Sequence, residues 1–338
     1  MKTVLAGDIG GTKTLLQLVE IDVATAHYNV VHEQRYASQN YVDFDLIVKD
    51  FLSQIEQKIT TTQSLPACFA VAGPIKNFNQ DKQTASVTNL NWQLDSLELK
   101  TTHQLRKVSL INDFESIAHG LHILSEQDLV TLQTGQAQDK GVKLIMGAGT
   151  GLGVCQLVQH GSSYSVLASE GGHCDFAPAD EQQTRLLLYL LKKYPHVSYD
   201  RILSGLGIEN IFSFLANEQK KDNESFVTNT LAADDPAAQI SNMVNEQPIA
   251  KETIAMFMSI YGAQAGNFAL TALPYGGVYI GGGIAPKLIE TLEGSNFLSA
   301  FKQKGRMNAL MDAFPIHVIM DAQVGVKGAA VFSCRSDC

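Results

Sequence analysis

Two segments far apart in the chain follow the same pattern of strand, glycine loop and strand. In the first, the β-rich run 3–6 leads into the glycine turn 7–14, and 15–21 resumes an extended pattern. In the second, 143–146 leads into 147–153, which has glycine at every second position, and an extended run follows. A unit that recurs predicts an internally duplicated architecture. The length of 338 residues agrees with two domains.

Both glycine loops join two strands, whereas the familiar phosphate loops join a strand to a helix. Neither G-x-x-x-x-G-K-[ST] nor G-x-G-x-x-G occurs in the chain. Glycines at a hairpin turn still let backbone N–H groups approach a phosphate, and Thr12 and Thr14 offer hydroxyls. An ordinary glycine hairpin is the alternative interpretation.

A strand that ends in a carboxylate lies between the two loops. The apolar run 108–111 precedes Asn112 and Asp113, and Phe114, Ile117, Ala118 and Leu121 then recur at helical spacing. Substrates approach a sheet where a strand end meets a helix start, and the free N–H groups there favour anions. The alternative is that Asn112 or Asp113 only caps the helix. The glycine loops elsewhere favour a catalytic role, because they suit a polyphosphate opposite the carboxylate.

Three further segments carry polar or glycine-rich patterns. Glu170 and His173 are separated by two glycines, which suits a ligand with several hydroxyls. The run 277–280 predicts a strand, and Gly281, Gly282 and Gly283 after it would let a purine lie on the backbone. Trp92 stands beside amides that could bind a sugar, and core packing explains it equally well. Together, the glycine turns and Asp113 predict phosphoryl transfer, with Asp113 accepting a hydroxyl proton and Mg²⁺ bridging the phosphates.

Composition excludes several classes of protein. The formal net charge is −9 without a Lys/Arg block, so nucleic acid and anionic membranes are poor partners. Five cysteines without CxxC spacing predict free thiols and a cytoplasmic protein, and the N-terminus shows no signal peptide.

Residues 253–273 lack charges, but polar residues and glycines interrupt them, which predicts a buried helix. No metal site is predicted, because His173 and Cys174 have no second pair at ligand spacing.

Six motifs, taken in order, resemble those of the bacterial ATP-dependent glucokinases, which belong to the hexokinase, actin and Hsp70-like superfamily. They are Asp8–Thr14, Leu110–Phe114, Gly147–Gly153, Glu170–His173, Arg201–Gly205 and Gly281–Ile284. The resemblance implies an α/β fold of two ribonuclease H-like lobes with a cleft between them. It implies a small domain of residues 1–112 plus 321–338, a large domain of residues 113–320, and a homodimer.

The resemblance also implies a role for each motif. The activity would be phosphorylation of glucose at its 6-hydroxyl by ATP with Mg²⁺, the first step of glycolysis, with Asp113 as the general base. The residues implied to contact glucose are Asn112, Glu170, His173 and Asp200. Those implied to contact ATP are Asp8, Ile9, Gly10, Gly11, Thr12 and Lys13 in the first phosphate loop, Gly147, Gly149, Thr150 and Gly151 in the second, and Gly281, Gly282 and Gly283 beside the adenosine.

Two positions depart from the family pattern. Asp200 replaces a glutamate and is one methylene shorter, and Leu206 stands where a proline is usual. The related ROK kinases carry a C-x-C-G-x-x-G-C zinc cluster, which this sequence lacks, so zinc is excluded. A ROK-type repressor would need a helix-turn-helix before the first glycine loop, and only seven residues precede Asp8. A non-catalytic sugar sensor, or a kinase for another hexose or amino sugar, is the alternative function.

Overall fold

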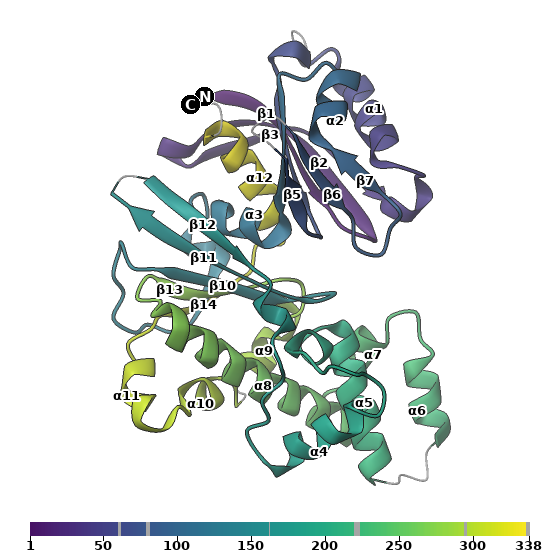
Figure 1. The fold of residues 1–338 in the computed structure, drawn as a ribbon, viewed down its shortest axis with the longest axis vertical. Coiled ribbons are helices and arrows are strands. Elements are labelled where there is room, and N and C mark those ends of the chain that lie inside the picture. The colour runs from purple at the N-terminus through teal and green to yellow at the C-terminus, as the bar shows by residue number, and fades with distance from the viewer. Residues whose placement is uncertain (60–61, 79–81, 162, 220–223, 294–295, 336–338) are drawn as a thin grey trace. The chain divides into compact units, whose positions relative to one another are not determined.

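The computed structural model describes residues 1–59, 62–78, 82–161, 163–219, 224–293 and 296–335. The chain divides into two compact units, each of which contains a large β-sheet (Figure 1). Unit 1 comprises Met1–Asp128 and Asp321–Cys338, and unit 2 comprises Leu129–Met320. Unit 1 is therefore built from the two ends of the chain, and unit 2 is continuous.

The first crossing between the units follows Asp128, whereas the family resemblance implies a boundary after Asn112. Helix α3 (Asp113–Gly120) packs on helix α12 (Val324–Arg335), which is the last helix of unit 1. The strand before α3 and the helix itself thus belong to one unit.

The sheet of unit 1 has five strands in the order β3-β2-β1-β4-β8. Strands β1, β2 and β3 are an antiparallel meander, and β4 and β8 run parallel to β1. A second sheet of this unit has the order β5-β6-β7. The strands are β1 (Lys2–Ile9), β2 (Lys13–Asp22), β3 (His27–Ala37), β4 (Pro66–Val71), β5 (Ile75–Asn77), β6 (Gln83–Ser86), β7 (Gln93–Asp95) and β8 (Lys107–Asn112).

Helices cover both faces of the five-stranded sheet (Figure 1). Because side chains alternate along a strand, Leu5 joins the core under α1 (Phe44–Ile55), and Val4 joins the core under α12. Helix α1 begins after Asp43, whose carboxylate accepts the N–H of Leu46 at 3.1 Å, and buries residues three and four apart. A further helix of unit 1, α2 (Ser96–Thr102), packs beside β8.

Helices α3 and α12 cross with their backbones almost in contact. A Cβ at Gly328 would lie 1.7 Å from the carbonyl oxygen of Ser116, and one at Gly120 would lie 2.5 Å from that of Val324. The hydroxyl of Ser116 also donates to the carbonyl of Gly325 at 2.6 Å. Only glycine allows this approach, so the crossing depends on these two positions.

The sheet of unit 2 has the order β12-β11-β10-β13-β14-β9. Its first five strands repeat the order and the directions of the unit 1 sheet, with β10 in the place of β1. The predicted internal duplication is confirmed. The strands are β9 (Leu129–Gln133), β10 (Lys143–Ala148), β11 (Leu152–His160), β12 (Ser163–Ser169), β13 (Gly277–Gly281) and β14 (Ile316–Ile319).

Helix α8 (Pro248–Ala272) runs through the core of unit 2, where Phe257 and Tyr261 are fully buried. This confirms the prediction of a buried helix for 253–273. Within the described ranges, no helix combines the length and apolar character that spanning a membrane requires. The other helices of unit 2 are α4 (Glu181–Leu190), α5 (Gly205–Gln219), α6 (Glu224–Leu231), α7 (Pro236–Asn242), α9 (Ile289–Glu293), α10 (Phe297–Lys302) and α11 (Asn308–Met311).

Candidate active site

In unit 1, the strand register brings two predicted site segments to one edge of the sheet. Ile9 of β1 pairs with Val71 of β4, and Val71 pairs with Asn112 of β8. These three strands are parallel, so their carboxyl ends meet at the same edge. The first glycine turn and the pair Asn112 and Asp113 therefore lie close together, as expected where ligands approach an open α/β sheet.

Asn112 and Asp113 form the start of α3. Asn112 is its N-cap: Oδ1 accepts the N–H of Phe114 at 2.9 Å, and Nδ2 donates to the carbonyl of Gly73 at 3.4 Å. Asp113 Oδ1 accepts the same Phe114 N–H at 3.0 Å. The helix cap is thus present, and it also fixes the direction of both side chains.

Two acidic side chains at this edge have raised pKa values. Burial, and then the charge of Asp8, raise the pKa of Asp113 to about 7, although the N–H of Phe114 acts in the opposite direction. Burial raises the pKa of Asp8 to about 6. Gly325, near the start of α12, approaches Asp8 so closely that a Cβ would lie 3.0 Å from Oδ2. The start of α12 thus lies beside the Asp8 carboxylate.

The first glycine turn is closed by the bond from Gly10 N–H to the carbonyl of Lys13 at 2.9 Å. Ser38, in the 3-10 turn Ser38–Asn40 directly after β3, supports this glycine turn: its hydroxyl donates to the carbonyl of Gly10 at 2.8 Å and its N–H donates to that of Thr12 at 3.0 Å. Thr12 and Lys13 are exposed. Thr14 is buried and its hydroxyl bonds to Ser38, so the expectation that Thr14 offers a hydroxyl to a ligand is wrong.

In unit 2, the second glycine loop packs against the triple glycine. A Cβ at Gly147 would lie 2.4 Å from the carbonyl oxygen of Gly281, with which it pairs in the sheet. Gly282 has φ +81°, and a Cβ there would lie 2.5 Å from the carbonyl oxygen of Ala148. Gly149 and Gly283, in contrast, face open space. The two segments therefore form one glycine-lined surface with room beside it.

Glu170 and His173 lie next to this loop. Gly172, between them, is buried so closely that a Cβ would lie 1.9 Å from the carbonyl oxygen of Leu152, the residue with which β11 begins. The side chains of Glu170 and His173 are 76% and 63% exposed, and their closest N and O atoms are 3.9 Å apart. Both side chains are consequently available to a ligand.

Asp200 has a different environment from the other predicted sugar contacts. Its Oδ1 accepts the backbone N–H of Leu152 at 2.8 Å. It lies in the 3-10 turn Tyr199–Arg201, which precedes α5. This side chain is thus bonded to the end of the second glycine loop.

Comparisons with known proteins show the family to which the chain belongs. The family model described as Glucokinase matches residues 5–336. The chain belongs to the glucokinase family. A glucokinase of Trichormus variabilis is 42% identical, and the match covers 99% of this chain and 100% of that protein. A glucokinase of a Synechocystis strain is 38% identical, with 98% of each chain covered.

Solved structures of glucokinases have the same fold. The crystal structure of a glucokinase from an Antarctic psychrotroph has a TM-score of 0.83 and 30% identity, with 99% of both chains covered. A glucokinase from Balamuthia mandrillaris, crystallised with glucose, has a TM-score of 0.80 and 21% identity over 99% of this chain and 94% of that one. The predicted actin/hexokinase-type α/β fold is confirmed.

Two residues that shape the candidate site, Tyr261 and Ser38, are missing from the sequence prediction. Tyr261 of α8 reaches the second loop, where its hydroxyl accepts the N–H of Ala148 at 3.2 Å. Ser38 supports the first turn from 28 residues away. Neither residue stands in a local motif that could have revealed it. Trp92 is buried and donates to the carbonyl of Tyr41 at 3.2 Å, so of its two interpretations core packing is the correct one.

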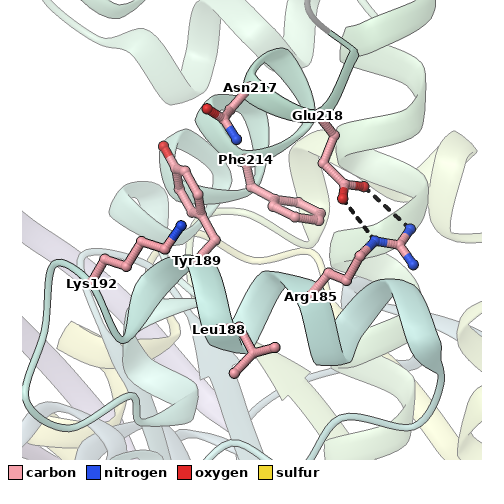
Figure 2. Close-up of a pocket in the computed structure, with 7 residues that line it drawn as sticks. All are labelled: Arg185, Leu188, Tyr189, Lys192, Phe214, Asn217 and Glu218. Atoms are coloured by element: carbon pink, nitrogen blue, oxygen red, sulfur yellow. Dashed lines mark hydrogen bonds and ion pairs between the residues drawn. The ribbon is translucent and has the colours of Figure 1, made fainter.

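A small pocket of about 180 Å³ lies elsewhere in unit 2, between α4 and α5 (Figure 2). Arg185 of α4 and Glu218 of α5 form an ion pair beside it at 2.7 Å, and Tyr189 and Phe214 line it. None of the predicted site residues lines this pocket. It is therefore not part of the candidate active site.

Proposed function

We propose that the protein transfers the γ-phosphoryl group of ATP to the 6-hydroxyl of glucose, giving glucose 6-phosphate, as in the first step of glycolysis. The observation that carries this proposal is Asp113, an acidic side chain at the start of α3, directly after β8, whose pKa is raised to about 7. A general base works best when its pKa lies near the operating pH, because it is then both ionised and basic.

Asp113 would take the proton of the 6-hydroxyl while the oxygen forms its bond to the γ-phosphorus and the bond to the leaving ADP breaks. The N–H of Phe114 bonds to Asp113 Oδ1 and holds the carboxylate in one direction. Orientation of this kind contributes to the rate because the attacking hydroxyl and the base need no further ordering.

The residues proposed to contact the nucleotide lie in the glycine-rich segments. In unit 1, the exposed Thr12 and Lys13 offer a hydroxyl and a positive charge to the phosphates. In unit 2, the open space at Gly149 and Gly283 leaves room for a ligand against the backbone. The residues proposed to contact ATP are Asp8–Lys13, Gly147, Gly149, Thr150 and Gly151 for the phosphates, and Gly281–Gly283 for the adenosine.

Mg²⁺ is the cation proposed to accompany ATP, and Asp8 is the residue proposed to hold it. Carboxylate oxygens are ligands that Mg²⁺ prefers, and it commonly combines one or two of them with substrate phosphates and water. Among the described residues, no group of three or more His, Cys, Asp or Glu could hold a metal ion. A bound Mg²⁺ would neutralise charge on the phosphates and favour the ionised form of Asp8.

Glucose would be held by Asn112, Glu170 and His173. The exposed side chains of Glu170 and His173 offer a carboxylate and an imidazole for hydrogen bonds to sugar hydroxyls. Asn112 keeps its amide beside Asp113 through its bonds to Phe114 and Gly73. Carboxylate and amide groups discriminate between sugars, because an analogue that lacks a hydroxyl leaves the protein group unpaired.

We make two further proposals: a homodimer, which the family resemblance supports, and a cytoplasmic location, which the five cysteines without CxxC spacing support. Light scattering of the purified protein would test the first, and a mass equal to one chain would contradict it.

A coupled assay of ADP release with ATP, Mg²⁺ and a panel of sugars tests the function. Glucose is expected to give the highest kcat/KM, and chelation of Mg²⁺ is expected to abolish turnover. A kinase for another hexose or an amino sugar would instead show its highest kcat/KM with that sugar. Sugar binding without ADP release would identify a non-catalytic sensor.

A further inference from the structure

The Asp200 carboxylate closes the end of the second glycine loop. Its Oδ1 accepts the N–H of Leu152 at 2.8 Å, directly after the loop. A Cβ at Gly151 would lie 2.5 Å from the same oxygen, so the carboxylate fills the space where a side chain would otherwise stand. A side chain at residue 151 would therefore require the Asp200 carboxylate to move.

The segment that carries Asp200 holds the loop at a second point. The N–H of Gly205, at the start of α5, donates to the carbonyl of Gly149 at 2.9 Å. Ser204 links the turn that carries Asp200 to the first turn of α5: its hydroxyl donates to the carbonyl of Asp200 at 2.7 Å and accepts the N–H of Gly207 at 3.1 Å. The segment 200–205 therefore holds the loop at Gly149 and at Leu152.

We propose that Asp200 is a positioning residue that keeps the loop Gly147–Gly153 in the shape that binds the nucleotide phosphates, rather than a residue that reads a sugar hydroxyl. A loop with alternate glycines loses much conformational entropy when it is ordered, so a bond that orders it in advance favours binding. A bond from a backbone N–H to a carboxylate is charge-assisted and suits this purpose. With Oδ1 bonded to Leu152, a sugar hydroxyl could use only the remaining acceptor positions of this carboxylate.

This inference rests on the proposed function and changes the role of one residue in it. The family's glutamate is one methylene longer than Asp200. At this position the shorter side chain reaches Leu152, while the space toward the loop is already closed at Gly151. Asp200→Glu is therefore expected to displace either the carboxylate or the loop.

Three variants test the proposal. Asp200→Ala removes the acceptor, and Asp200→Asn keeps an acceptor oxygen of the same shape without the charge. Asp175→Ala is the matched control, because Asp175 forms a β-bridge with Ser198 nearby, is exposed, and bonds to the His196 side chain at 2.7 Å instead of to the loop. The measurements are KM and kcat for ATP and for glucose separately, and amide hydrogen exchange of residues 147–156 without substrates.

Asp200→Ala should raise KM for ATP about 10- to 100-fold, as expected when a hydrogen bond to a charged group is lost, and should speed exchange in the loop. Asp200→Asn should restore most of the protection from exchange, and the control should match the parent. The kcat/KM ratios between glucose and its epimers should stay unchanged in all three variants.

The opposite pattern would overturn the proposal: an unchanged KM for ATP and unchanged exchange in Asp200→Ala, together with altered ratios between sugars. The proposal would also be contradicted if Asp200→Asn protected the loop from hydrogen exchange no better than Asp200→Ala does. Because exchange is measured without substrates, it tests the ordering of the loop even in a protein that phosphorylates no sugar. Such a protein would refute the proposed function separately.

Discussion

The carboxylate of Asp113 has neighbours that act on its pKa in opposite directions. Burial and the negative charge of Asp8 favour the protonated form, and the N–H of Phe114 favours the ionised form. The balance gives a pKa of about 7, which a surface aspartate would not have. The helix cap and the catalytic base are therefore compatible interpretations of the same side chain, because the capping bond also orients the base.

Replacing Asp113 by asparagine is expected to keep the fold and to lower kcat about 10²- to 10⁴-fold, because the amide caps the helix but accepts no proton. The measurement is steady-state turnover of glucose with ATP and Mg²⁺, with circular dichroism as the check on folding. Glu115→Gln is the matched control, since Glu115 is the other acidic residue in the first turn of α3. Turnover within a few-fold of the parent in Asp113→Asn would limit this residue to capping.

The same two carboxylates make stability depend on pH. The pKa values of Asp8 and Asp113 are raised in the folded protein, to about 6 and about 7, so the folded state binds protons more tightly than the unfolded chain does. The stabilisation of the folded state that comes from this tighter proton binding is present at about pH 4 and is lost as the pH rises to about 7. Above that pH both groups are ionised and partly buried, which is unfavourable.

Asp113→Asn should therefore stabilise the ligand-free protein relative to the parent at about pH 8, and less or not at all at about pH 5. The free energy of unfolding in urea, measured for both proteins at the two pH values, checks this. A difference that does not change with pH would contradict the raised pKa of Asp113.

Among the elements, α3 and α12 form the tightest contact described here. The Cβ of an alanine at position 328 would lie 1.7 Å from the backbone oxygen of Ser116, so the helices must separate to admit it. Gly328→Ala is expected to destabilise the protein by about 1–3 kcal/mol or more, the usual cost of overpacking.

Thermal unfolding measures this effect. Gly283→Ala is the matched control for stability, because a Cβ there meets nothing within 4 Å. A Gly328→Ala protein as stable as that control would show that the crossing tolerates a side chain.

The elements also show how far the sequence predicts the fold and the site. The two glycine hairpins, the strand before Asp113 and the long helix were predictable because their signals are local: alternation, glycine spacing and helical periodicity. Three contacts at the site join residues that are far apart in the sequence. Ser38 bonds to the first turn across 28 positions, Tyr261 to the second loop across 113, and Asp200 to Leu152 across 48. No local pattern encodes such contacts, since packing in three dimensions decides them.

At the scale of the whole molecule, unit 1 is completed by a helix that follows unit 2 in the sequence. Val326, Ala329, Ala330 and Val331 of α12 share a core with residues of β1, β2 and β4. A chain that ends at Met320 would leave this face of the sheet exposed to water.

Such a truncated chain is expected to lose the cooperative unfolding of unit 1 and to bind a hydrophobic dye, while unit 2 keeps its protection from exchange. Hydrogen exchange followed by mass spectrometry distinguishes the two units. Native-like protection of β1 and β4 in the truncated chain would show that α12 is dispensable.

The order of synthesis gives this arrangement a further consequence. A ribosome releases β1, β2 and β4 first and α12 only after all of Leu129–Met320 has been made. At ~5–20 residues per second this interval is roughly ten to forty seconds. During that time the nascent chain presents an apolar sheet face that nothing downstream can yet cover. A chaperone that shields apolar surface on emerging chains would find a binding site there, and the yield of folded protein would depend on how quickly α12 follows.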